Sequence, residues 1–163
     1  MTDMGVTDGP SPVPRAAEVE VSRVDAIVER ARSTYRRVGP FEAAQIWASG
    51  GLLIDTRPAA QRAEFGEIPG AIVIERNVLE WRLDPTSPHH HDKITRPDQD
   101  IVVLCQAGYA SSLAAWSLRQ LGLSKATDLE GGYEAWLEAG LPTTLNPSGR
   151  LPGGEGGPSA VAL

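Results

Sequence analysis

Three short apolar runs constrain the fold of this chain more than any other feature. They cover residues 52–54, 71–74 and 101–104, and the last of them, Ile-Val-Val-Leu, is the most strongly apolar. Short runs that are apolar throughout are typical of strands buried on both faces of a sheet. Strands that alternate with helices predict an α/β domain with a mainly parallel central sheet and helices on both faces. The helical patterns that follow the runs lie at residues 58–65, 77–82, 111–121 and 132–139.

Two further helices are predicted before the first apolar run. Ser22 is placed to cap the first of them, with Asp25 three residues later as in a capping box. A second helical pattern starts after Pro40 and ends before Gly50. The first helix carries an apolar stripe at helical spacing, which we expect to lie on a core. The stripe consists of Val24, Ile27, Val28 and Ala31.

The length of 163 residues corresponds to about one domain. Both ends of the chain are rich in proline or glycine and poor in large apolar residues. Such composition is typical of segments that do not pack. We therefore predict a single domain at residues 22–145, with disordered tails at residues 1–21 and 146–163.

Composition also excludes several classes of protein. The chain has 15 basic and 21 acidic residues, a net charge of -6, and a nucleic-acid partner is not expected because phosphate binding needs a basic surface. No apolar stretch approaches the roughly 18 residues that cross a bilayer, and no signal-peptide pattern is visible. We expect a cytoplasmic protein with no membrane partner. The only cysteine, Cys105, excludes an intramolecular disulfide.

Cys105 directly follows the strongest apolar run and is the candidate nucleophile. A loop containing Gly108 comes next, and Ser111 or Ser112 is placed to begin a helix. Glycine permits a close backbone approach, so loop N–H groups can converge on the sulfur, and the helix N-terminus adds partial positive charge. Both effects favour a nucleophilic thiolate. The alternative is that Cys105 is a small buried apolar residue.

Four ordered blocks between Leu52 and Pro142 carry a family resemblance. They are Leu52–Arg57, Glu64–Ala71, the Cys105 loop and Leu129–Pro142. The sequence resembles the single-domain rhodaneses of the rhodanese-like sulfurtransferase family. The resemblance implies that Cys105 accepts a sulfane sulfur as a persulfide and passes it to a thiophilic acceptor. The donor would be thiosulfate or another persulfide, and the acceptor cyanide, a thiol or a protein.

The resemblance also assigns the site residues. Asp55 and Arg57 would help to order the site, and Glu64 would be a structural partner of Arg57 or of a loop amide. The alternative is that Asp55 caps the helix that follows at Pro58 and Arg57 is a solvated surface charge. No metal or organic cofactor is implied, because sulfur itself is the group transferred. The loop that would hold substrate and persulfide consists of Gln106, Ala107, Gly108, Tyr109, Ala110 and Ser111.

Two positions depart from the family pattern. Ala110 stands where the loop often carries a basic side chain, and Glu67 stands where the family commonly has His. Both changes put thiosulfate in doubt as the donor. Ala110 also leaves open a non-catalytic module that binds a partner or relays sulfur. A related phosphatase would need a longer loop that ends in arginine, whereas this loop runs into Ser111 and Ser112.

Other conspicuous residues have structural interpretations. The consecutive His89, His90 and His91 lie among prolines and are interpreted as an exposed loop, because adjacent imidazoles cannot easily face one metal ion. Trp136 and Tyr133 are expected in the core. Arg62 fits a solvated helix face as well as it fits a charge near the site.

Overall fold

The computed structural model describes residues 21–149, and its centre is a four-stranded parallel sheet. The strand order is β2-β1-β3-β4, and every pairing is parallel, so the predicted α/β fold is confirmed. The predicted tails lie almost wholly outside the described residues. Residues 146–149 are described, and the backbone N–H of Asn146 donates to the Thr143 carbonyl. The strands are β1 (Leu52–Asp55), β2 (Ile72–Val73), β3 (Ile101–Leu104) and β4 (Ala126–Asp128).

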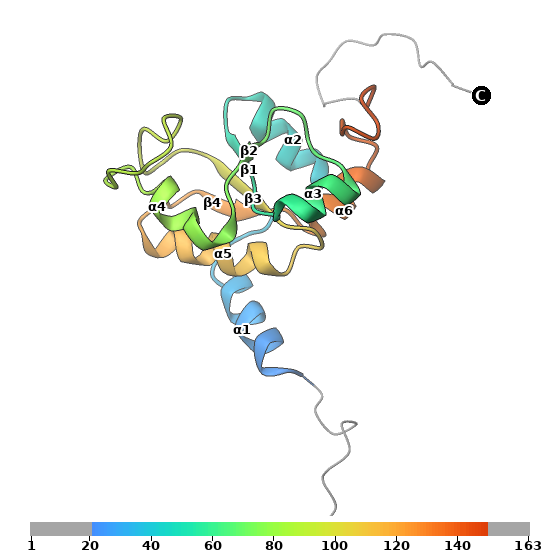
Figure 1. Ribbon diagram of the computed structural model, residues 1–163. Coiled ribbons are helices and arrows are strands. Elements are labelled where there is room, and N and C mark those ends of the chain that lie inside the picture. Colours follow the sequence, from blue (N-terminus) through green and yellow to red (C-terminus); the bar gives the residue numbers. More distant parts are fainter. Residues whose placement is uncertain (1–20, 150–163) are drawn as a thin grey trace, which may run out of the picture.

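Helices cover both faces of the sheet (Figure 1). The face with α4 and α5 buries Leu52 and Ile54 of β1, and the face with α2 and α6 buries Leu53. Successive side chains of β3 alternate between the two faces in the same way, as side chains of a strand must. Both faces are therefore apolar, which explains the uninterrupted apolar runs. The helices are α1 (Arg23–Arg32), α2 (Pro40–Ala48), α3 (Ala59–Phe65), the 3-10 turn η2 (Arg76–Val78), α4 (Leu79–Leu83), α5 (Ala110–Gln120) and α6 (Gly132–Glu138).

The outer strands differ from the prediction. β2 is only two residues long and lies at the edge of the sheet, where Val73 is exposed, so the run at 71–74 is not a strand buried on both faces. β4 was not predicted at all. It contains Thr127 and Asp128 and lacks an apolar run, yet it is buried throughout because β3 and α5 pack against it.

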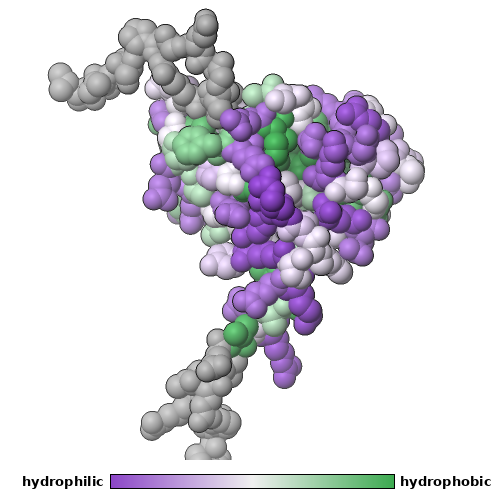
Figure 2. Space-filling view, turned by 180° about the vertical axis from the view of Figure 1, so that it is seen from behind, coloured by the Kyte–Doolittle hydropathy of each residue, from purple (hydrophilic) through white to green (hydrophobic). Residues whose placement is uncertain are grey.

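The first helix only partly lies on the core. Val28 and Ala31 are buried, whereas Val24 and Ile27 are 59% and 45% exposed, so the prediction of a fully packed stripe is wrong. α1 packs on α5 through its C-terminal half and projects away from the sheet (Figure 1). From behind, this protruding helix shows both green and purple side chains (Figure 2). The stripe has the helical spacing that was predicted, but within residues 21–149 its N-terminal half has no element to pack against.

The α6 side of the core is anchored by aromatic residues. Trp136 and Tyr133 are fully buried, which confirms the expectation that they are core residues. The Trp136 indole Nε1 donates to the Pro142 carbonyl at 3.0 Å, and its ring meets Trp47 edge-on at 6.0 Å between centroids. A buried indole needs such a partner for its N–H.

Among residues 21–149, none of the helices combines the length and the apolar character that a membrane span requires.

Shortening an apolar side chain should affect stability differently in the two halves of the α1 stripe. Val28→Ala removes buried methyl groups and should lower the free energy of unfolding by about 2 kcal/mol. Val24→Ala removes exposed ones and should change it by less than about 0.5 kcal/mol. Urea unfolding of both variants measures the difference. Equal losses would contradict the arrangement of α1.

Candidate active site

Cys105 lies just past the carboxyl end of β3, where its thiol is held by the following loop. Its residue exposure is 9%, and its Sγ accepts hydrogen bonds from the backbone N–H groups of Gly108 at 3.2 Å and Ser111 at 3.3 Å. Two of the loop amides therefore converge on the sulfur. A buried apolar cysteine would not attract such donors, and this cradle favours a thiolate or a persulfide anion.

Gly108 makes this cradle possible. Its φ is +83°, a conformation that side chains rarely adopt, and an added Cβ would lie 2.7 Å from the Gly131 nitrogen. The loop is further tied to the start of α6, because the N–H of Tyr133 donates to the Cys105 carbonyl at 2.8 Å. The N–H of Glu134 donates to the Gln106 carbonyl at 3.1 Å. The loop is thus fixed from two sides.

The two serines of the loop do not cap the helix as predicted. α5 begins at Ala110 after Tyr109, which makes no side-chain cap, and Ser111 and Ser112 are fully buried inside its first turn. Both hydroxyls instead donate to Oδ2 of Asp128, at 3.1 Å and 2.9 Å. The Ser111 Oγ also lies 3.3 Å from the Cys105 Sγ. A side chain pointed at the interior cannot reach the free N–H groups of its own helix end.

Asp128, at the end of β4, is a site residue that the sequence did not reveal. Its carboxylate is fully buried and pairs with Arg37, whose Nε and Nη2 lie 2.9 Å from the two oxygens. The Tyr35 hydroxyl donates to Oδ1 at 2.7 Å. Burial and the adjacent Asp128 carboxylate raise the pKa of the Tyr35 phenol, so this hydroxyl remains a donor.

Arg32 and Arg37 both hold the outer side of the Cys105 loop. Their guanidinium groups donate to the Gly108 carbonyl at 2.8 Å and 2.9 Å. Arg32 also donates to the Ser112 Oγ at 2.9 Å and lies over the Tyr109 ring. These arginines come from a segment more than 70 residues earlier, outside the four blocks of the resemblance, so no local pattern identified them. They place two positive charges beside a loop that lacks one at Ala110.

Arg57 holds the other side of the loop. It is 1% exposed, and its Nη2 pairs with Asp55 at 2.7 Å. Its remaining donors reach the Gly66 carbonyl at 2.9 Å and the Gln106 side chain at 3.1 Å. The guanidinium also lies 3.8 Å from the centre of the Tyr133 ring. Arg57 is therefore a buried structural link and not a solvated charge.

Glu64 does not take the place expected for it. It is exposed on α3, and among residues 21–149 its side chain forms neither a hydrogen bond nor an ion pair. The partners of Arg57 are Asp55, Gly66 and Gln106 instead. Glu67, at the position where the family often has His, forms an ion pair with Arg62, whose Nε also approaches the Arg57 carbonyl at 3.3 Å.

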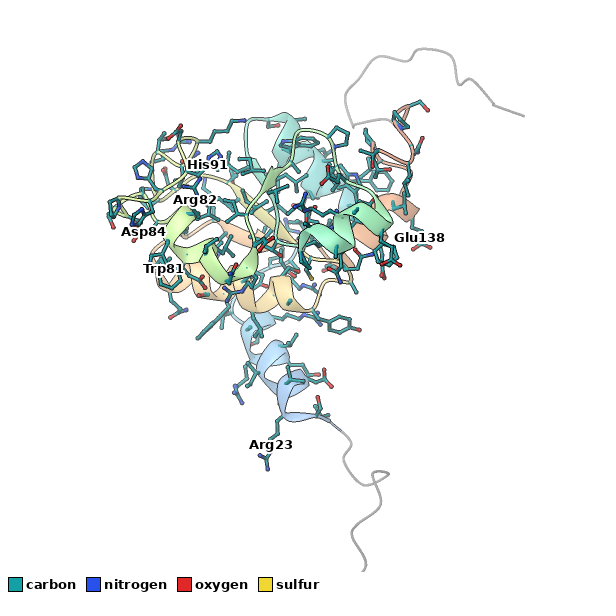
Figure 3. All side chains as sticks on the ribbon, in the orientation of Figure 1. Arg23, Trp81, Arg82, Asp84, His91 and Glu138 are labelled. Carbon is teal, nitrogen blue, oxygen red and sulfur yellow. The ribbon has the colours of Figure 1, made fainter. Side chains whose placement is uncertain are left out.

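The histidine loop lies away from this site. Figure 3 places His91 beside Arg82 and Asp84 near α4, at the opposite edge of the molecule from Glu138 of α6. The His91 N–H donates to the Arg82 carbonyl at 2.7 Å, while His89 and His90 are exposed. Within residues 21–149, no group of three or more potential metal ligands comes together.

A surface cavity of about 360 Å³ adjoins the outer side of the Cys105 loop. Tyr109, which is 60% exposed, forms its wall on the loop side, and α1 with the preceding Val21 forms the rest. The residues that line it are Val21, Asp25, Val28, Glu29, Arg32 and Tyr109.

Comparison with known proteins agrees with this geometry. The family model of the rhodanese-like domain matches residues 41–139. A sulfurtransferase of Allochromatium vinosum is 32% identical over 91 residues, which cover 56% of this chain and 76% of that protein. The thiosulfate sulfurtransferase GlpE of Pseudomonas paraeruginosa is 30% identical over 105 residues, with 63% of this chain and 84% of that protein covered.

A solved structure extends the likeness over more of the chain. It belongs to a Rhodopseudomonas palustris protein of unknown function, described as a possible tyrosine phosphatase, with a TM-score of 0.67 and 28% identity. The match covers 83% of this chain and 99% of that chain. The family model itself spans more than half of the present sequence and includes the Cys105 loop. The chain therefore belongs to the rhodanese-like domain family.

Proposed function

We propose that this protein is a sulfurtransferase that carries a sulfane sulfur as a persulfide on Cys105. One observation carries the proposal: the Cys105 Sγ accepts two backbone N–H groups, at 3.2 Å and 3.3 Å, at the carboxyl end of a buried strand. A thiolate and a persulfide are both anions, so the same donors serve the nucleophile and its intermediate. The sulfurtransferases among the relatives support the same activity.

The chemistry is a double displacement at sulfur. The Cys105 thiolate attacks the sulfane sulfur of the donor, a new S–S bond forms, and the old bond breaks with its electron pair on the leaving group, which is sulfite for thiosulfate. The acceptor thiolate or cyanide then attacks the terminal sulfur, and the Cys105 thiolate leaves. Because the chain has one cysteine, no second thiol of its own can resolve the persulfide.

The preferred donor follows from the charges at the loop. Thiosulfate is a dianion and needs cationic groups at the mouth of the site. Arg32 and Arg37 each direct an N–H group to the Gly108 carbonyl on the outer side of the loop, and Arg37 is also paired with Asp128. Ala110 offers no charge. We therefore propose that a low-molecular-weight or protein persulfide is used better than thiosulfate.

The missing charge at Ala110 also favours a second candidate function. This is a module that relays sulfur to a protein acceptor without rapid turnover of small substrates. A phosphatase is disfavoured, since a phosphate clasp needs a free guanidinium in the loop. Residues 106–112 contain no arginine.

Loss of the nucleophile tests the proposal directly. After incubation with thiosulfate or glutathione persulfide, intact-mass measurement should show the protein gain one sulfur atom, and cyanide should then release thiocyanate. Cys105→Ser should gain none, and its turnover should fall to the uncatalysed background. If wild-type protein gains no sulfur from either donor, or if the serine variant retains turnover with unchanged circular dichroism, the proposal fails.

Restoring a charge at Ala110 tests the argument about the donor. Ala110 is exposed at the start of α5, so Ala110→Arg has room for the longer side chain. We expect kcat/KM for thiosulfate to rise about tenfold, equivalent to about 1.4 kcal/mol. The value for glutathione persulfide should change by less than about twofold. Ala110→Gln is the matched control of similar size, and an equal rise with Gln and Arg would show that charge is not the cause.

A further inference from the structure

The Ser111 hydroxyl has one proton and two neighbours that could receive it. Its Oγ lies 3.3 Å from the Cys105 Sγ on one side and 3.1 Å from the Asp128 Oδ2 on the other. All of these groups are buried. Whichever neighbour receives the proton, the other faces a lone pair of the same oxygen.

The surroundings of Asp128 decide which neighbour receives the Ser111 proton. A carboxylate only accepts, and the Asp128 carboxylate pairs with Arg37 and receives further donors from Tyr35 and Ser112. Hydrogen bonds to an ionised acceptor are stronger than those between neutral groups. The Ser111 proton therefore points to Asp128, and the Ser111 lone pair faces Sγ, where it can accept an S–H but cannot donate to a thiolate.

We propose that Asp128 is a positioning residue that withholds the Ser111 proton from Cys105 and so stabilises the resting thiol against the thiolate. This inference rests on the proposed function only in that the Cys105 thiolate is the nucleophile. The cradle then supplies two backbone donors to the sulfur and no hydroxyl donor. Thiolate formation is set by a balance between these amides and Asp128.

Other charged and titratable groups surround the site from each packed element. Arg32 on α1, Arg37 after it and Arg57 after β1 are cations, and Asp55 is paired with Arg57. Glu134 on α6 reaches the Gln106 side chain at 3.4 Å, and Tyr133 on α6 and Tyr109 in the loop carry phenols. All of them are retained in the variants below. A change in the pH dependence can therefore be attributed to Asp128 and Ser111.

Alkylation of Cys105 by iodoacetamide between pH 5 and 10 tests the proposal, because its rate follows the thiolate fraction and needs no sulfur transfer. Asp128→Asn should lower the pH of half-maximal rate by about one unit. Ser111→Ala removes the acceptor of the S–H and should also lower this midpoint pH, but by less than Asp128→Asn does. In the Ser111→Ala background, Asp128→Asn should shift the midpoint by less than half as much as it does alone.

Two controls keep the test decisive. Ser112→Ala removes another donor to the same Asp128 oxygen without touching Sγ, and its midpoint should equal that of the wild type. If Asp128→Asn does not fold, the pair Ser111→Ala and Ser112→Ala still tests the proposal.

A higher midpoint for Ser111→Ala would mean that Ser111 donates to the thiolate and would overturn the proposal. Equal Asp128→Asn shifts in both backgrounds would also overturn it, because the effect would then be a direct Coulombic one. Failure of sulfur transfer with these shifts intact would count against the proposed function alone.

Discussion

Parallel pairing of β1, β3 and β4 is the constraint on which the site depends. In this register Asp55 lies opposite Leu104, and Val103 lies opposite Asp128, so the three strands end at the same edge of the sheet. Cys105 leaves the sheet between two buried carboxylates. Sites in parallel sheets form at such carboxyl ends, because all the chains there turn into loops together.

Two ion pairs, one buried and one partly buried, then hold the loop from opposite sides. Asp55 with Arg57 reaches the loop through Gln106, and Asp128 with Arg37 reaches it through Ser111 and the Gly108 carbonyl. Removing one member of such a pair leaves an uncompensated buried charge and is costly. Among residues 21–149, no buried side-chain nitrogen or oxygen lacks a partner. The loop is therefore a pre-organised cradle, which is what stabilisation of an anionic sulfur requires.

The features that the sequence predicts correctly share a physical basis. β1 and β3 were predicted because both faces of each strand are covered, and this forces every position to be apolar. The amide cradle was predicted because Gly108 between a strand and a helix permits only a few backbone paths. The features that the sequence does not predict also share a physical basis. β4, the projecting half of α1 and the orientation of Ser111 and Ser112 all depend on what packs nearby, and periodicity does not report neighbours that are distant in the chain.

The amino-acid sequence by itself determined the fold class and the family and singled out Cys105 as the candidate nucleophile, because apolar patterning and backbone freedom are local properties. Only the tertiary structure decided what surrounds Cys105. Arg32, Arg37 and Asp128 meet at the Cys105 loop from segments that are far apart in the chain, while the nearby Glu64 points to solvent. A buried carboxylate is tolerated only where folding brings it a cation and donors, so the role of Asp128 emerges with the packing of β4 against α5 and the Arg37 segment.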